Sequence, residues 1–146
     1  MPRTLFLLVF FACFGITAEV FFVAFTNLYN NEPFCNEPLW SLTGKTYVWM
    51  AFIYALIPVF AGFFYNKLKH LPAPLRWAIY TLLIFTVEYI SGFLLEQFTG
   101  RCPWLYTTGW QVSGYIRLDY TPAWFFFSAI VEYLYRFVSG LFDAKA

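Results

Sequence analysis

Carboxylates inside long apolar stretches are the residues of this sequence best placed to do chemistry. Glu19, Glu88 and Glu132 each interrupt such a stretch. A carboxylate in apolar surroundings can bind a cation, line a transport pathway or act as a general acid or base. Residues three or four positions apart share one face of a helix. The faces that carry the acids are Gly15, Glu19, Phe22 and Thr26; Thr81, Glu88, Gly92 and Glu96; and Trp124, Ser128, Glu132 and Arg136.

The apolar stretches are long enough to be helices that cross a lipid bilayer. Hydrophobic residues make up 61% of the 146 residues and charged residues only 12%, whereas a soluble domain carries about 25% charged residues. We expect helices because a spanning segment needs about 20 residues and must satisfy its backbone groups internally. The expected fold is an all-α membrane protein. It is a bundle of four transmembrane helices in a single domain (residues 1–146), with an aromatic-rich cap of loops on the non-cytoplasmic side. The helices cover about residues 5–26, 47–65, 77–98 and 122–141, and Pro58 should kink the second.

The bilayer constrains where the acids can point. Near the midplane, where Glu88 and Glu132 fall, a charged side chain costs roughly 2.5–3.5 kcal/mol on insertion scales. We therefore expect the acids to face the bundle interior, as a pocket lined by Glu19, Glu88, Glu132, Arg136 and Gly92. In the alternative, the acids only hold the bundle together: Glu132 pairs with Arg136 four residues on, and a protonated Glu88 bonds to a hydroxyl. Interhelical polar bonds contribute only about 0.6–2 kcal/mol, which favours the functional pocket.

The basic residues divide unequally between the two sides of the predicted bundle. Short cytoplasmic segments carry an excess of Lys and Arg, so the richer side, which holds both termini, is assigned to the cytoplasm. That side has Arg3, Lys67, Lys69, Arg76, Arg136 and Lys145, and the other has Lys45, Arg101 and Arg117.

Two longer loops, about residues 27–46 and 99–121, then face outward and are rich in aromatic residues. They can pack together as a cap at the headgroup level or form an ordinary aromatic belt. At the mouth of the third and fourth helices these loops place Trp104, Tyr106, Arg117 and Asp119. The two charged residues can bind an anionic headgroup, or pair with Lys45 and Glu96.

Two of the three cysteines lie in these outward loops. Helix counting puts Cys35 and Cys102 on the same, non-cytoplasmic face, where compartments are oxidising. The sequence thus predicts a disulfide between them, worth roughly 2–4 kcal/mol. The alternative is two free thiols.

Several classes of function are disfavoured. A net charge of +1 gives no basic footprint for nucleic acid. A lone histidine, His70, and the lack of a CxxC motif argue against a metal or haem site. Phosphate-loop, dinucleotide and Ser/His/Asp patterns do not occur. We expect no metal and no cofactor, and we expect membrane lipids and a second copy or other membrane proteins as partners.

Short motifs spread along nearly the whole chain occur in a specific order. They are Gly15 with Glu19 and Phe22; Gly44-Lys45-Thr46-Tyr47-Val48-Trp49 with Ile53-Tyr54; Leu75-Arg76 with Ile79-Tyr80-Thr81-Leu82; Glu88-Tyr89-Ile90-Ser91-Gly92-Phe93; Gln97-Phe98; Cys102-Pro103-Trp104 with Tyr106; and Gly114, Leu118-Asp119-Tyr120, Trp124 and Glu132. In this order and spacing the chain resembles the transmembrane protein 229 family and the related bacterial family of CmpB-type ABC-transporter proteins. The family usually has an aspartate where this chain has Leu105. The resemblance implies a four-helix membrane protein. The chain has no nucleotide-binding motif, so it could not be an ATP-driven pump alone.

The leading hypothesis is a non-enzymatic multi-pass membrane protein that acts as a transporter-like or lipid- or cation-binding subunit of a larger complex. One alternative is an intramembrane enzyme that acts on a lipid, with Glu88 and Glu132 as acid and base. The other alternative is a purely structural subunit.

Overall fold

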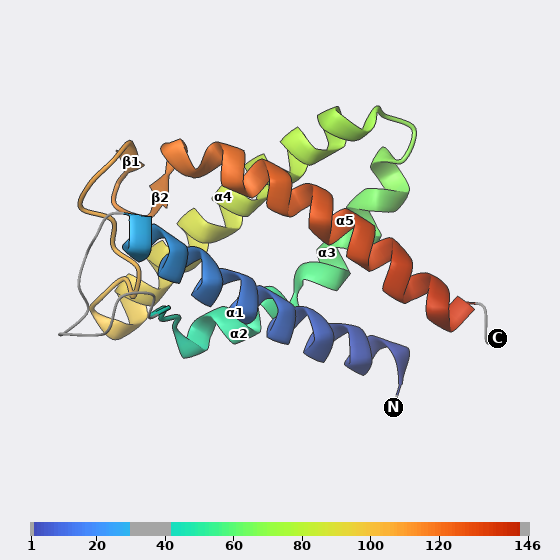
Figure 1. Cartoon of the computed structure of the whole chain (residues 1–146), viewed down its shortest axis with the longest axis horizontal. Helices are drawn as coiled ribbons and strands as arrows, with labels where there is room; N and C mark the ends of the chain where they lie inside the picture. Colours follow the sequence, from blue (N-terminus) through green and yellow to red (C-terminus); the bar gives the residue numbers. More distant parts are fainter. Residues whose placement is uncertain (1, 30–41, 144–146) are drawn as a thin grey trace. The chain divides into compact units, whose positions relative to one another are not determined.

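The computed structural model describes residues 2–29 and 42–143. In chain order these residues form the helices α1 (Arg3–Tyr29), α2 (Val48–Ala55), α3 (Ile57–Leu68) and α4 (Ala73–Thr99), the short strands β1 (Gln111–Val112) and β2 (Ile116–Arg117), the 3-10 helix η1 (Leu118–Tyr120) and the helix α5 (Thr121–Asp143) (Figure 1). Their packing separates two compact units, Met1–Phe60 with Leu141–Ala146, and Ala61–Gly140.

Four helical segments of the described residues are long and apolar enough to cross a bilayer. They are Arg3–Leu28, Val48–Leu68, Ala73–Thr99 and Leu118–Asp143. Large apolar side chains remain exposed along each of them, for example Leu5, Val9, Phe21 and Phe25 on α1. Such exposed side chains are unfavourable in water and suit contact with lipid. By length and composition, the prediction of four spanning helices is confirmed.

The second span is broken, as Pro58 predicts. Helix α2 ends at Ala55 and α3 begins at Ile57. Around the junction the backbone makes tighter, three-residue hydrogen bonds, from Leu56 N to Ile53 O (3.1 Å) and from Val59 N to Leu56 O (3.1 Å). Proline has no N–H to donate and crowds the preceding turn, which accounts for the break.

In the first unit, α2 packs along α1 (Figure 1). The closest approach is at Gly15, where a Cβ atom would lie 2.2 Å from Cγ of Tyr54. Phe11 is fully buried beside this contact on α1. Two contacts join the start of α1 to the end of α5: Arg3 donates to Asp143 (2.6 Å), and the rings of Phe6 and Phe142 lie 5.3 Å apart.

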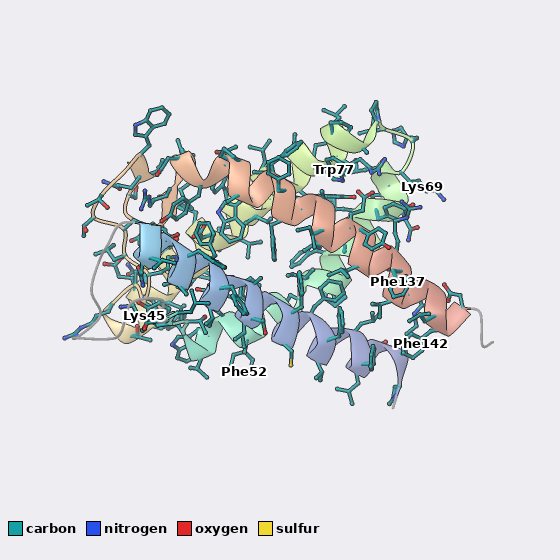
Figure 2. The ribbon with its side chains drawn as sticks, viewed as in Figure 1. Lys45, Phe52, Lys69, Trp77, Phe137 and Phe142 are labelled. Atoms are coloured by element: carbon teal, nitrogen blue, oxygen red, sulfur yellow. The ribbon has the colours of Figure 1, made fainter. Side chains whose placement is uncertain are left out.

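In the second unit, α4 and α5 cross in the view of Figure 1 and make side-chain contacts. Trp77 of α4, labelled in Figure 2, packs edge-on against Phe125 of α5, with ring centroids 5.8 Å apart. The last part of α3 also contacts α5, because a Cβ atom on Gly62 would lie 2.6 Å from the Tyr135 hydroxyl. The buried positions include unusually many polar residues, namely Arg76, Thr81, Ser128, Glu132 and Ser139.

The segment of residues 101–120 folds back over the end of α4. Helix α4 ends at Gly100, which adopts the left-handed conformation (φ 75°) and donates its N–H to Glu96 O. Strands β1 and β2 then form a small antiparallel hairpin in which Gln111 pairs with Arg117 and Val112 with Ile116. The sequence predicts a loop here. Strands this short cannot be recognised from an alternation of polar and apolar residues.

Candidate functional site

Glu19 lies in the first unit and holds the segment that precedes α2. Its carboxylate accepts a hydrogen bond from the Thr46 hydroxyl (2.7 Å) and a second from the Tyr54 side chain. Two further contacts keep residues 42–47 against α1. Asn27 Nδ2 donates to Thr43 O (3.2 Å), and Gly44 approaches so closely that a Cβ atom would lie 2.1 Å from Val20 O. Glu19 therefore binds a loop of its own chain.

Glu88 lies on α4 and is contacted by the 101–120 segment. The Tyr106 hydroxyl donates to Glu88 Oε1 at 2.9 Å. Because Glu88 precedes the end of α4 at Thr99 by eleven residues, this contact lies about 16 Å along the helix axis from that end. The loop thus reaches well down the side of the helix.

The same face of α4 continues through Gly92 to Glu96. Glu96 accepts a hydrogen bond from the Tyr115 hydroxyl, and Tyr115 O accepts one from the Trp104 indole (3.3 Å). Gly92 provides the space for this packing, since a Cβ atom there would lie 3.2 Å from the Tyr115 ring and 3.3 Å from Cys102 Sγ. Glu88, Gly92 and Glu96 together form one docking face for the loop, as their four-residue spacing predicts.

Arg117 and Asp119 form an ion pair with each other. Arg117 also donates to the Tyr120 hydroxyl (2.9 Å) and lies over the rings of Tyr120 (4.2 Å) and Tyr106 (6.0 Å). Asp119 in turn accepts the Trp110 backbone N–H (3.2 Å). Asp119 thus neutralises Arg117, and Glu96, the partner predicted for Arg117, is bound by Tyr115 instead.

These contacts shift the titration of groups in the 101–120 segment. The hydrogen bond that Tyr115 donates to Glu96, together with burial, raises the pKa of Tyr115 to about 12. The hydrogen bond to Asp119 raises the pKa of Arg117 further, which keeps it charged. Burial raises the pKa of the Cys102 thiol, so the neutral thiol predominates at neutral pH.

Glu132 pairs with Arg76 across the α4–α5 interface. Arg76 Nε donates to Glu132 Oε2 at 2.9 Å, and Nη2 donates to Oε1, so the pair is bidentate. Both residues are buried, with 9% and 5% of their surfaces exposed. The third Arg76 nitrogen donates to Leu71 O (2.7 Å), which ties the α3–α4 turn to the pair. The predicted pairing of Glu132 with Arg136 was wrong, and Arg136 instead lies over the Tyr65 ring (5.5 Å).

Of the three acids Glu19, Glu88 and Glu132, the two in the second unit are bound at different levels along α4. Glu88 and Arg76, the partner of Glu132, are twelve residues apart on α4, which is about 18 Å along the axis. Glu19 belongs to the other unit. Within residues 2–29 and 42–143, no three side chains of His, Cys, Asp or Glu gather as metal ligands would.

The predicted disulfide falls partly outside the described residues, because Cys35 lies in the stretch from 30 to 41. Cys102 is buried and has a free thiol. The disulfide is unsupported and stays a prediction, as does the packing of the two outward loops against each other.

Sequence reasoning missed two contributors to these contacts, Thr46 and Arg76. Thr46 stands beside Gly44 and Lys45 in a loop where nothing in the spacing points to Glu19. Arg76 was counted only among the basic residues of the cytoplasmic side, just before the third predicted helix. The buried acid Glu132 on the neighbouring helix was the available signal for Arg76, since buried charges are paired.

No protein-family model matches the sequence, and no solved structure matches the fold.

Proposed function

We propose that this chain is a non-enzymatic multi-pass membrane protein that acts as a structural subunit of a larger membrane complex. In this role Glu19, Glu88 and Glu132 hold loops and helices in place. We also propose that the chain is related to the transmembrane protein 229 and CmpB-type families, and that both of its termini lie in the cytoplasm.

One observation carries the structural role: each intramembrane acid is engaged by a side chain distant in the same chain. Thr46, Tyr106 and Arg76 are separated from their acids by 27, 18 and 56 residues. A transport pocket or an acid–base pair requires carboxylates that share a space and can reach a ligand. Here Glu88 and Arg76, the residue that binds Glu132, are about 18 Å apart along the axis of α4. The geometry therefore favours the structural alternative over the transport pocket and over the lipid enzyme.

The exposed apolar side chains support a membrane subunit. Each spanning segment exposes large apolar side chains, and on α5 Phe126, Ile130, Tyr133, Phe137 and Leu141 form one row over most of the helix. Lipid or neighbouring membrane proteins can cover such side chains.

A double-mutant cycle on Glu88 and Tyr106 tests the structural role. We expect Glu88→Gln and Tyr106→Phe each to lower the free energy of unfolding in detergent micelles by about 0.6–2 kcal/mol. The double variant should lose less than the sum, because the two side chains share one hydrogen bond. Tyr133→Phe is the matched control, since Tyr133 is exposed on α5 and its hydroxyl should contribute little.

Strict additivity of the two changes would contradict the structural role. So would a Glu88→Gln variant of unchanged stability that abolished ion or lipid transport in reconstituted vesicles. For the subunit role, native electrophoresis of mildly solubilised membranes should show the chain in an assembly much larger than its 17.2 kDa. Migration as a monomer would argue against a complex.

A further inference from the structure

The hairpin of residues 110–118 has an apolar face on which three of the four side chains are exposed. Its register pairs Val112 with Ile116, and Leu118 N donates to Trp110 O (2.8 Å), which extends the pairing by one step. Because side chains alternate along strands, Trp110, Val112, Ile116 and Leu118 share one face. Ile116 is buried, but Trp110, Val112 and Leu118 are 73%, 40% and 42% exposed.

The opposite face of the hairpin is polar and bonded to the chain itself. It carries Gln111 and Arg117. Arg117 is bound by Asp119 and Tyr120, and the Gln111 side chain accepts the Gly114 N–H (2.5 Å). A hairpin at a water-facing surface has its apolar side inward and its polar side outward. In this hairpin Gln111 is exposed, but so are three of the four apolar side chains, and the charge of Arg117 is neutralised by Asp119. The exposed apolar side chains suit an apolar exterior.

The depth of the segment supports the same environment. Helix α4 has 27 residues and is about 40 Å long, while a bilayer core is about 30 Å thick. The helix is therefore about 10 Å longer than the bilayer core. If all of this extra length projected beyond the outer boundary of the core, the Tyr106–Glu88 contact, about 16 Å from the helix end, would still lie inside that boundary.

The backbone of the segment is suited to a place with little water. Non-helical backbone is tolerated at membrane depth only where its polar groups find partners. Tyr106 N donates to Gly114 O (2.8 Å) and Tyr115 N to Val112 O (3.1 Å). Trp110 N is bound by the Asp119 carboxylate (3.2 Å). These bonds satisfy part of the backbone's hydrogen-bonding groups within the segment itself.

We propose that the 110–118 hairpin is seated in the outer interface of the bilayer, with its Trp110 face against phospholipid. Tryptophan favours this region because its ring is apolar and its N–H can reach the headgroups. The inference rests on the proposed membrane location and adds that this loop is a lipid-contacting element rather than an aqueous one.

Fluorine NMR of the whole protein in phosphatidylcholine nanodiscs tests the seating. Incorporation of 5-fluorotryptophan labels all six tryptophans, and Trp110→Phe assigns the Trp110 resonance by its disappearance. Unchanged positions of the other five resonances show that the variant folds, and Trp110→Tyr is the substitute if they move.

Phospholipid with a nitroxide near the glycerol and a water-soluble gadolinium chelate are then added separately. Trp49, exposed on α2, reports on the spans, and Trp104, bonded to Tyr115, reports on the protein side of the same segment.

We expect the spin-labelled lipid to broaden the Trp110 resonance at least as strongly as that of Trp49, and more strongly than that of Trp104. The gadolinium chelate should affect Trp110 weakly. Broadening of Trp110 by the chelate alone would overturn the proposal by placing the hairpin in water. Broadening by neither reagent would also overturn it, because protein would then cover the face. If lipid failed to broaden Trp49 as well, the membrane location itself would be wrong.

Discussion

Gly15 shows how a missing side chain positions a polar one. The Tyr54 ring occupies the space in which a Cβ atom of residue 15 would stand. From there the Tyr54 side chain reaches Glu19, one helical turn further along α1. The close approach of α1 and α2 and the hydrogen bonding of the acid thus depend on the same glycine.

We expect Gly15→Ala to destabilise the protein by about 1–3 kcal/mol, because the added methyl group overpacks the interface with Tyr54. Gly140→Ala is the matched control. It also lies in a helix, and no atom lies within 4 Å of the position its Cβ would take. That change should be neutral or stabilise by up to about 1 kcal/mol, as alanine is the better helix former.

Reversible unfolding in mixed micelles, followed by circular dichroism, measures both variants. Equal effects of the two changes would mean that the Gly15–Tyr54 contact does not determine the packing of α1 on α2.

At the residue scale the sequence identified the acids but not their partners. Glu19, Glu88 and Glu132 stand out because charges are rare in spanning segments. Their partners come from 18 to 56 residues away, and helical spacing reports only on neighbours three or four positions apart. That is why Arg136 was chosen for Glu132 and Arg76 was overlooked.

Helices α4 and α5 are joined by one buried ion pair, whose removal should be costly. Changing Arg76→Met leaves the Glu132 carboxylate buried without its cation, and we expect a loss of about 3–5 kcal/mol. Replacing both residues, Arg76→Met with Glu132→Leu, should recover much of that loss because no charge remains to desolvate. Arg136→Met, which removes only a contact with the Tyr65 ring, should cost about 1 kcal/mol or less.

Chemical unfolding in one detergent of the wild type, the single variants Arg76→Met and Glu132→Leu, the double variant and Arg136→Met gives the comparison. A double variant that is as unstable as both single losses combined would show that Arg76 and Glu132 act independently.

At the element scale, apolar length and Pro58 predicted the four spans and the α2–α3 break. Most of the observed helices extend beyond the predicted ends. Helix α4, for example, begins at Ala73, because Pro74 suits the first turn of a helix, where its missing N–H is not needed. The hairpin could not be predicted in the same way. Its two strands have two residues each, and contacts with α4 and Asp119 hold it together rather than strand propensity.

At the scale of the whole molecule, the six-to-three division of basic residues predicts that both termini are cytoplasmic. A reporter fused after Ala146 should be reached by protease or label only from the cytoplasmic side. A reporter inserted at Ser113, at the tip of the hairpin, should show the opposite accessibility or none. Outside labelling of the C-terminal reporter would reverse the assignment, and with it the side on which the hairpin meets the bilayer.

The Arg76–Glu132 pair also governs the timing of assembly during synthesis. The two residues are 56 positions apart, so at about 5–20 residues per second the ribosome adds the intervening chain in about 3–11 s. During this interval α4 is completed, but Arg76 cannot yet pair with Glu132, because α5 has not been synthesised that far. Helix α4 can therefore complete its packing only after α5 emerges, and a nascent chain that stops short of Glu132 retains an arginine that a membrane quality-control system could recognise.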